Sequence, residues 1–293
     1  MRLNPDTTAN LLSYLTNARL AEETALRELS SGRRASLPSD DPSAVAAVLS
    51  DHARMSRDDQ FIESVATVRD MLSVADSSLS SVVTALQRAI TLGVQGGTGT
   101  ISAANRKAIA ADVAGISDQI LGIANMSYRG SFIFAGTAAT KPYVEDSTGV
   151  HYVGNNVTNG VMVTESLTVK TNTPGSTIFS SASANVFNSL AQLKAGLESD
   201  DAEAIQQATS SIRNAFDQVT SARAAYGNTI QQLDACRQFL DAEQLNLKTR
   251  ENSLVGADPI KAASDLAEAQ FAREATLQAV GRQSRLSLLD YLR

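Results

Sequence analysis

Asp40, Asp41 and His52 are the residues whose types and spacing come closest to a chemical site. Two adjacent carboxylates followed by an imidazole could transfer a proton or share a metal ion. The only other histidine, His151, falls in a segment of a different kind. Pro42 follows Asp41 directly, and an aspartate before a proline is typical of a helix start. We therefore predict that Asp40 and Asp41 cap a helix and that His52 is solvated.

Other signals for catalysis or cofactor binding are weak. The glycine-rich segment 93–100 lacks the Lys-(Ser/Thr) pair of a phosphate-binding loop, and no Gly-x-Ser-x-Gly sequence is present. The single cysteine, Cys236, lies on the inner side of a predicted helix, where it is expected to pack as a small hydrophobe. The sequence therefore predicts a protein that is not an enzyme and that uses no cofactor or metal.

The charge and the apolar content of the sequence indicate which classes of binding partner are not expected. The 293 residues carry a formal net charge of −6, and the basic residues form no long run. Phosphate binding requires clustered Lys and Arg, so nucleic acid is not an expected partner. No apolar stretch is long enough to span a bilayer, and the amphipathic ends lack Trp, so no membrane partner is expected either.

The strongest structural signal is a heptad repeat near the end of the chain. Its members are Ile205, Ile212, Val219, Tyr226, Leu233, Leu240, Leu247 and Leu254. A helix of this length reaches roughly 75 Å, and its apolar row must be covered along the whole length. The sequence therefore predicts a helical rod, in which this helix pairs with other long helices.

Two further apolar rows supply the partners. One contains Val65, Val68, Leu72, Ala75, Leu79, Val82, Leu86 and Ala89, and the other Ile109, Val113, Ile116, Ile120 and Ile123. They predict a helical hairpin, because the glycine-rich segment 93–100 between them does not favour helix. The predicted rod core comprises Val65, Leu72, Leu79, Leu86, Ile116, Ile120, Ile212, Val219, Leu233 and Leu240.

The hairpin is followed by short β-type runs among Gly, Asn, Thr and Pro. They predict a small β module. The predicted fold is mainly α: a long-helix bundle or coiled-coil rod with a β insertion and terminal helices. We divide the chain into a terminal helix over 1–41, rod halves over 42–130 and 183–256 on either side of a surface-facing module over 131–182, and a second terminal helix over 257–293.

The terminal helices are thinly amphipathic. The first carries Leu11, Leu15, Ala18, Ala25 and Leu29 on one side, and the second carries Ile260, Ala263, Ala267 and Phe271 on one row. Neither has enough apolar surface to fold alone. Asp41-Pro42 and Asp258-Pro259 each predict a new helix start, which separates both ends from the rod.

Motifs at both ends resemble the flagellin superfamily. Leu29-Ser30-Ser31-Gly32-Arg33-Arg34 is similar to a Leu-Ser-(Ser/Thr)-Gly-basic motif near the N-terminus of that family, and Leu288-Leu289-Asp290-Tyr291-Leu292 to its common C-terminus. Two further segments, Pro38-Ser39-Asp40-Asp41-Pro42 and the run 131–137, resemble the hook–filament junction members more than filament flagellins. The resemblance covers essentially the whole chain.

This resemblance implies a structural component of the bacterial flagellum, a ring between hook and filament built by self-assembly. The implied partners are further copies of the chain, hook-associated protein 1, flagellin and a flagellar export chaperone. The implied location is extracellular, after type III export without a cleaved signal peptide. The resemblance also implies that the two terminal helices become ordered and pair only when the protein assembles. Their expected inner-tube contacts are Leu11, Leu15, Leu29, Leu288, Leu289 and Leu292.

Two alternatives remain open from the sequence. A short filament flagellin differs from a junction protein mainly in copy number and local motif form. A secreted coiled-coil effector or adhesin would self-associate without its ends, whereas the assembly hypothesis requires residues 1–30 and 260–293.

Overall fold

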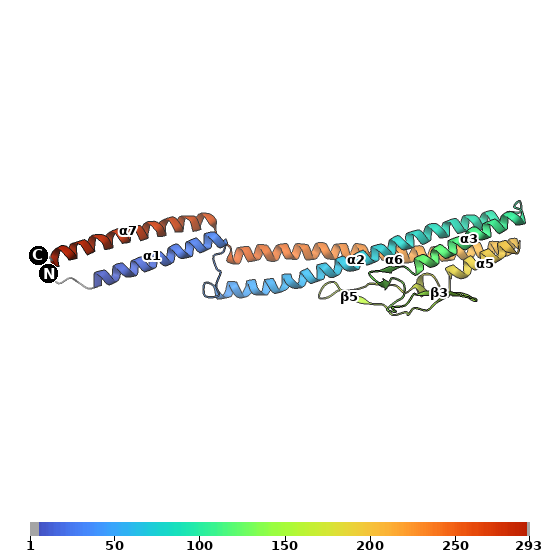
Figure 1. Cartoon of the computed structure of the whole chain (residues 1–293), viewed down its shortest axis with the longest axis horizontal. Helices are drawn as coiled ribbons and strands as arrows, with labels where there is room; N and C mark the ends of the chain where they lie inside the picture. The colour runs from blue at the N-terminus through green and yellow to red at the C-terminus, as the bar shows by residue number, and fades with distance from the viewer. Residues whose placement is uncertain (1–5, 292–293) are drawn as a thin grey trace. The chain divides into compact units, whose positions relative to one another are not determined.

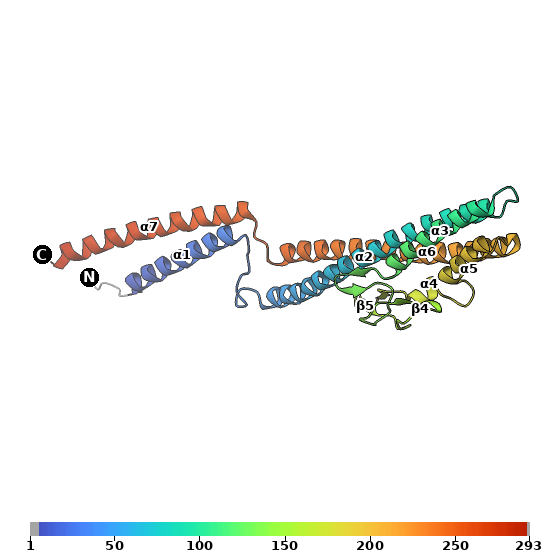
Figure 2. The same ribbon diagram turned by 45° about the vertical axis from the view of Figure 1, so that its right-hand side comes forward.

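The computed structural model describes residues 6–291, with side chains from 10 to 282 (Figure 1, Figure 2). The described residues form two compact units. One unit is drawn from both ends of the chain, up to Arg57 and from Ala242, and the other is Asp58–Asp241. Long helices dominate, and the only strands described are short antiparallel pairs, so the predicted fold class is confirmed.

Two helices, α2 (Pro42–Gly96) and α6 (Ala202–Val255), run through both units. Their side-chain contacts show that they are antiparallel. Arg69 Nε lies 2.6 Å from Asp234 Oδ1, and farther along α2 the Asp76 carboxylate lies 2.9 Å from Arg223 Nε. Because the residue number rises on one helix as it falls on the other, the two apolar rows meet along their length.

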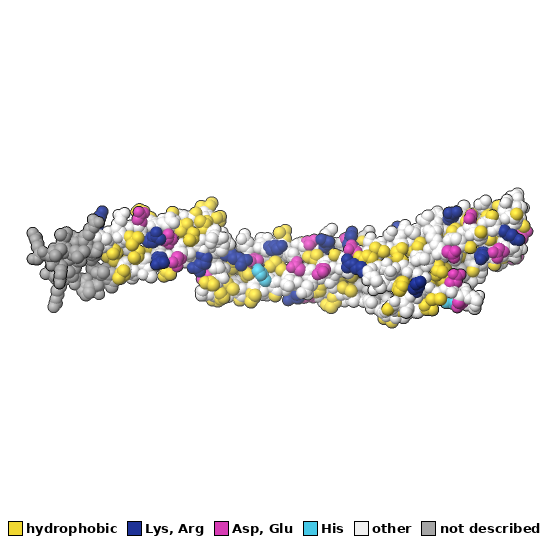
Figure 3. All heavy atoms as spheres, viewed as in Figure 1, with side chains coloured by type: hydrophobic (Ala, Val, Ile, Leu, Met, Phe, Trp, Pro, Cys, Tyr) yellow, Lys and Arg dark blue, Asp and Glu magenta, His cyan; other side chains and the backbone are white. Residues whose placement is uncertain are grey.

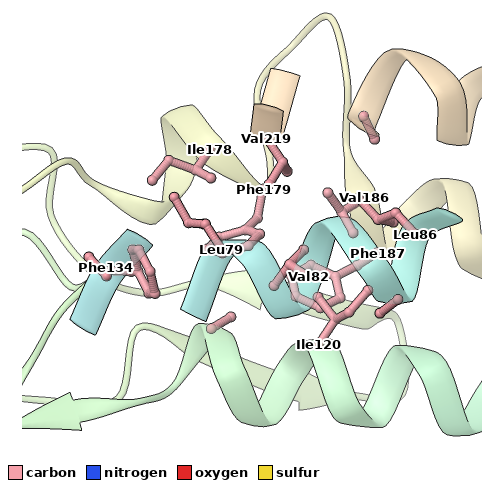
Figure 4. Packing of buried hydrophobic residues seen from close by; sticks show 14 of the residues in the cluster. Leu79, Val82, Leu86, Ile120, Phe134, Ile178, Phe179, Val186, Phe187 and Val219 are labelled. Atoms are coloured by element: carbon pink, nitrogen blue, oxygen red, sulfur yellow. The ribbon is translucent and has the colours of Figure 1, made fainter. Parts of the chain in front are cut away.

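In the unit Asp58–Asp241, α2 and α6 are joined by α3 (Ala103–Ala124) and α5 (Val186–Glu198). The four helices share one apolar core, part of which Figure 4 shows around Leu79 and Ile120. The structure places every position predicted for the rod core inside it: Val65, Leu72, Leu79, Leu86, Ile116, Ile120, Ile212, Val219, Leu233 and Leu240 are all buried.

Helix α5 is a separate element that the sequence analysis did not distinguish from the helix that follows. Asn185 begins it by accepting a hydrogen bond from the backbone N–H of Asn188 at 3.0 Å. The chain then turns at Asp200, whose φ is 58°, and the Asp201 carboxylate caps the start of α6 through the N–H of Ala204. Polar residues with local side-chain hydrogen bonds interrupt the helix here.

The expectation that glycine ends α2 at residue 93 is wrong, because α2 continues to Gly96. The reason is close packing. A Cβ at Gly93 would lie 2.4 Å from Thr209 Oγ1, and one at Gly96 would lie 2.4 Å from Leu197 Cδ2. These glycines sit inside the helix because α5 and α6 approach too closely for a side chain.

The β module begins slightly before its predicted start. Its hairpins pair β1 (Ser127–Tyr128) with β2 (Ser131–Phe132), β3 (Tyr143–Asp146) with β4 (Gly149–Tyr152), and β5 (Gly160–Met162) with β6 (Thr168–Lys170), followed by α4 (Gly175–Ile178). The module is anchored by aromatic rings. Phe134 and Phe179 meet edge to face with centroids 5.2 Å apart, and both are buried in the helical core (Figure 4).

A buried arginine connects the end of α2 with the turn between α5 and α6. Arg106 is 7% exposed, and its guanidinium donates to the carbonyls of Gly96 and Thr98 and pairs with Asp200. Gly96 is the last residue of α2, Thr98 lies in the turn that follows it, and Asp200 belongs to the turn before α6. One buried side chain thus supplies donors to acceptors near both turns.

We predict that Arg106→Met lowers the free energy of unfolding by about 2–3 kcal/mol, because it removes the donors from these acceptors. Urea unfolding followed by circular dichroism measures this. Lys107→Met, at the exposed neighbouring position, is the control and should change stability by less than about 0.5 kcal/mol. Equal effects of both variants would contradict the role assigned to Arg106.

We also predict that Gly93→Ala destabilises the chain by about 1–3 kcal/mol, through contact with Thr209. Adding Thr209→Ala should restore part of the loss, since it removes the nearest atom. In contrast, Gly115→Ala on α3 adds a Cβ into open space and should raise stability by up to about 1 kcal/mol. A stabilising Gly93→Ala in thermal unfolding would show that helix propensity outweighs the contact.

Candidate assembly surface

The helices at the two chain ends, α1 (Asp6–Ser31) and α7 (Pro259–Tyr291), lie side by side in one compact unit (Figure 1, Figure 2). Alanines form the buried part of their interface: Ala25, Ala262 and Ala269 are each less than 7% exposed. Arg273 Nη1 adds an ion pair with Glu22 Oε2 at 2.7 Å. Because alanine buries little apolar area, this pair has a much thinner core than the central helices.

The predicted inner-tube contacts fall in different environments. Leu11 and Leu15 are half-buried on the side of α1 that also carries Ala25, whereas Leu29 is 41% exposed. The side chains of Leu288 and Leu289, and Leu292 as a whole, lie outside the described residues.

The apolar row predicted on α7 faces away from α1. Ile260 is 81% exposed and Phe271 is 74% exposed, and Ala263 and Ala267 between them are also exposed. At 100° per residue these four positions share one helix face, and the residues that meet α1 lie on the opposite one. Helix α7 therefore has a second apolar face that is left exposed by the described residues.

Helix α1 also exposes large apolar side chains. Leu12, Tyr14, Leu20 and Leu26 are all more than half exposed, and sequence reasoning missed them. The sequence contains the information needed to find them, because α1 carries leucines on more than one face. A single partner helix cannot cover all of these faces. Figure 3 shows apolar side chains at the surface of this pair, next to charged ones.

A groove of about 550 Å³ runs along one side of the α1/α7 pair. Its lining includes small residues such as Ala18, Ala21 and Ala272 and the acidic residues Glu28 and Glu268. The lining also includes Leu20, Thr24 and Asp265, so the groove combines apolar contact surface with a few polar groups. The geometry therefore suits the side chains of another helix.

The residues first considered for acid–base chemistry have structural partners. Asp41 caps α2 as predicted, through the N–H of Ala44 at 3.0 Å. The prediction for Asp40 is wrong, because its carboxylate accepts from the N–H groups of Ser36 and Leu37 and so holds the preceding turn. His52 is half-exposed but contacts Glu251 at 3.1 Å. The N–H groups of Ser36 and Leu37 occupy the Asp40 carboxylate, so it does not cap α2. The sequence alone does not show this preference.

His151 lies on β4, away from His52 in the chain and in the other compact unit. Cys236 is buried, with Sγ 3.5 Å from the carbonyl oxygen of Val163, and burial raises the pKa of its thiol. Within residues 6–291, no grouping of His, Cys, Asp and Glu could hold a metal ion. Nor does any helix in this range combine the length and apolar character of a membrane span.

Two family models match the chain. The bacterial flagellin N-terminal helical region matches residues 6–139, and the bacterial flagellin C-terminal helical region matches residues 209–292. Together they include α1, α7 and most of the central helices. The chain belongs to the flagellin superfamily.

Within the superfamily, the chain is similar to flagellar hook-associated protein 3 of Salmonella typhimurium, with 25% identity and 95% of each chain covered. The same protein of Escherichia coli is 25% identical over 90% of each chain. The flagellar junction protein FlgL of Legionella pneumophila has the same fold, with a TM-score of 0.63 and 16% identity, over 72% of this chain and 100% of that one.

These relatives confirm the resemblance to the hook-associated members over a filament flagellin or a secreted effector. The chain is accordingly a structural protein of the bacterial flagellum. Its apolar helix faces, rather than a catalytic centre, are the features that such a role requires.

We predict that the Asp41 cap is lost in acid. Hydrogen bonds from the Ala44 N–H and the Ser43 hydroxyl lower the pKa of Asp41 from its ordinary value of 3.8. A lowered pKa means that the cap stabilises the fold above about pH 4 and is lost as the pH falls through the lowered value. The Ala44 amide resonance should follow this titration in NMR spectra. Asp41→Asn caps without a charge, so it should remove the titration, and an unchanged curve would contradict the prediction.

Proposed function

We propose that this chain forms the junction ring between hook and filament, with α1 and α7 as its assembly elements. The observation that carries the proposal is the apolar face of α7, from Ile260 to Phe271, which the described part of the chain leaves exposed. Exposed apolar faces of this kind mark protein–protein contacts. Similarity to hook-associated protein 3 over nearly the whole chain supports the location.

The partners follow from this role. Neighbouring copies of the chain would cover the free faces of α1 and α7 within the ring. Hook-associated protein 1 would contact the ring on the hook side, and flagellin would contact it on the filament side. We also propose that the export chaperone binds the C-terminal helix. An apolar helix face that is exposed before assembly needs a binding partner during export. Leu288, Leu289 and Leu292 remain proposed contacts in that helix.

The thin α1/α7 interface supports delayed ordering of the chain ends. Its alanines bury little apolar area, so the interface offsets little of the entropy lost when two long helices become ordered. Contacts with neighbours would supply the remainder. A chain whose ends are easily opened is also suited to type III export in an unfolded state, without a cleaved signal peptide, to the outside of the cell.

The β module would face outward from the ring. It is attached to the central helices through its aromatic residues and takes no part in the α1/α7 pair. We propose a purely structural role for the whole chain, without enzymatic activity.

Deletion of the gene tests the role directly. We expect hooks without filaments in electron micrographs, with unassembled flagellin in the culture medium, because filament subunits would lack the ring to which they attach. Loss of filaments with no other flagellin secreted would instead identify the chain as the filament subunit. Flagella of normal appearance would rule out both flagellar roles.

Substitution on the free face of α7 tests the surface. We predict that Phe271→Ser reduces incorporation into flagella at least tenfold, while the circular dichroism of the monomer is unchanged, because Phe271 is 74% exposed. Val157→Ser is a matched control, since Val157 is 56% exposed in the β module. Immunoblots of isolated hooks and filaments measure incorporation. Normal incorporation of the Phe271 variant would contradict the assignment of this face.

A further inference from the structure

The motif Leu29–Arg34 contains one expected inner-tube contact, Leu29, and the residues after it end α1. Helix α1 ends at Ser31, and Gly32 follows with a φ of 67°, a conformation that glycine adopts without strain. The Ser31 hydroxyl donates to the carbonyl of Arg27 and accepts from the N–H of Arg33. The motif thus turns the chain out of α1 in a fixed direction.

The segment after the turn pairs with a segment far away in the sequence. Arg33 and Gly256 form an antiparallel β-bridge. The N–H of Arg34 donates to the carbonyl of Val255 at 2.7 Å, and the N–H of Ala257 donates to the carbonyl of Gly32 at 2.9 Å. One segment leads from α1 toward α2, and the other leads from α6 to α7. The two connections to the terminal helices are therefore held together.

Gly256 follows the end of α6 in a place where a side chain does not fit. A Cβ at this position would lie 2.3 Å from the backbone oxygen of Asn252. Backbone cannot move aside as a flexible side chain can, so only glycine fits here. A side chain at residue 256 would therefore disturb the end of α6, from which the segment that pairs with Arg33 continues.

Charged side chains strengthen the crossing. The Glu251 side chain is only 15% exposed and contacts two cationic or ionisable groups, Arg33 Nη2 at 2.5 Å and His52 Nε2 at 3.1 Å. Arg34 Nη2 donates to the carbonyl of Leu254 at 3.0 Å and lies 3.4 Å from the Asp41 carboxylate. Arg34 thus meets the negative end of α6 and the capping residue of α2.

We propose that Gly32–Arg34, Glu251 and Val255–Ala257 form a connector clasp that fixes the orientation of the terminal helix pair for assembly, with Glu251 as its positioning residue. This inference rests on the proposed function. A single peptide connection leaves a helix free to rotate, whereas two paired connections restrict it. Such restriction lowers the entropy lost when the helices enter a ring.

Glu251→Gln in the full chain tests the clasp, because Gln keeps the size of the side chain and removes its charge. Amide hydrogen exchange at Arg34 and Ala257 reports the bridge directly. We expect exchange at both amides to become about tenfold faster, with no change at buried positions of α2 such as Leu72. Incorporation into flagella should fall by a similar factor. Asp241→Asn removes an exposed ion pair within α6 and should change neither quantity.

Two further variants make the test decisive. Gly256→Ala should accelerate exchange at the same amides through its contact with Asn252. Exchanging the charges, with Arg33→Glu and Glu251→Arg together, should recover most of the protection and of the incorporation. Failure to recover would show that Glu251 acts through packing rather than charge, which would overturn its assigned role.

Unchanged exchange in Glu251→Gln would overturn the clasp itself. Faster exchange with normal incorporation would overturn its part in assembly while leaving the proposed function intact. Failure of the proposed function would appear separately, as normal incorporation of the Phe271 variant.

Discussion

The apolar seam between the antiparallel helices α2 and α6 is the constraint on which the rest of the structure depends. Leu72, Leu79 and Leu86 from α2 share one core with Ile212 and Val219 from α6, all nearly inaccessible to solvent. Burial of such side chains stabilises a fold by roughly 1.5–3 kcal/mol each. The helices α3 and α5 and the aromatic residues of the β module add to this core rather than forming cores of their own.

The seam changes character toward the start of α2. The heptad that contains Val65 and Leu72 continues back to Asp58 and Asp51, and both carboxylates are buried. Arg250 Nη1 lies 3.5 Å from Asp51 Oδ1, whereas Oδ2 has no hydrogen-bond partner among the described residues. Buried charges cost stability but disfavour other registers. These two carboxylates therefore make the start of the α2 row less apolar than the part that contains Leu72.

The terminal helices α1 and α7 differ from the central helices in how they pack. Their interface is built from alanines, and their large apolar residues, such as Phe271, face solvent. The heptad row of the central helices is thus covered within one chain, whereas the apolar row predicted on α7 is exposed. This difference suits the proposed assembly role, because an exposed apolar row can be covered by a neighbouring molecule. The paired connections at Arg33 and Gly256 lie where these two kinds of helix pairing meet.

Periodicity in the sequence determined the long helices, the buried seam positions and the helix starts at Pro42 and Pro259, because these depend on local spacing and capping. Sequence motifs also indicated the family. Close approach of helices decided that Gly93 lies inside α2, and the pairing of α1 with α7 decided which face of α7 stays free. The partners of Asp40, Asp51 and Glu251 likewise required the folded chain. Local patterns fix which residues form a helix, but only tertiary packing decides which of its faces is covered, since that choice depends on residues distant in the sequence.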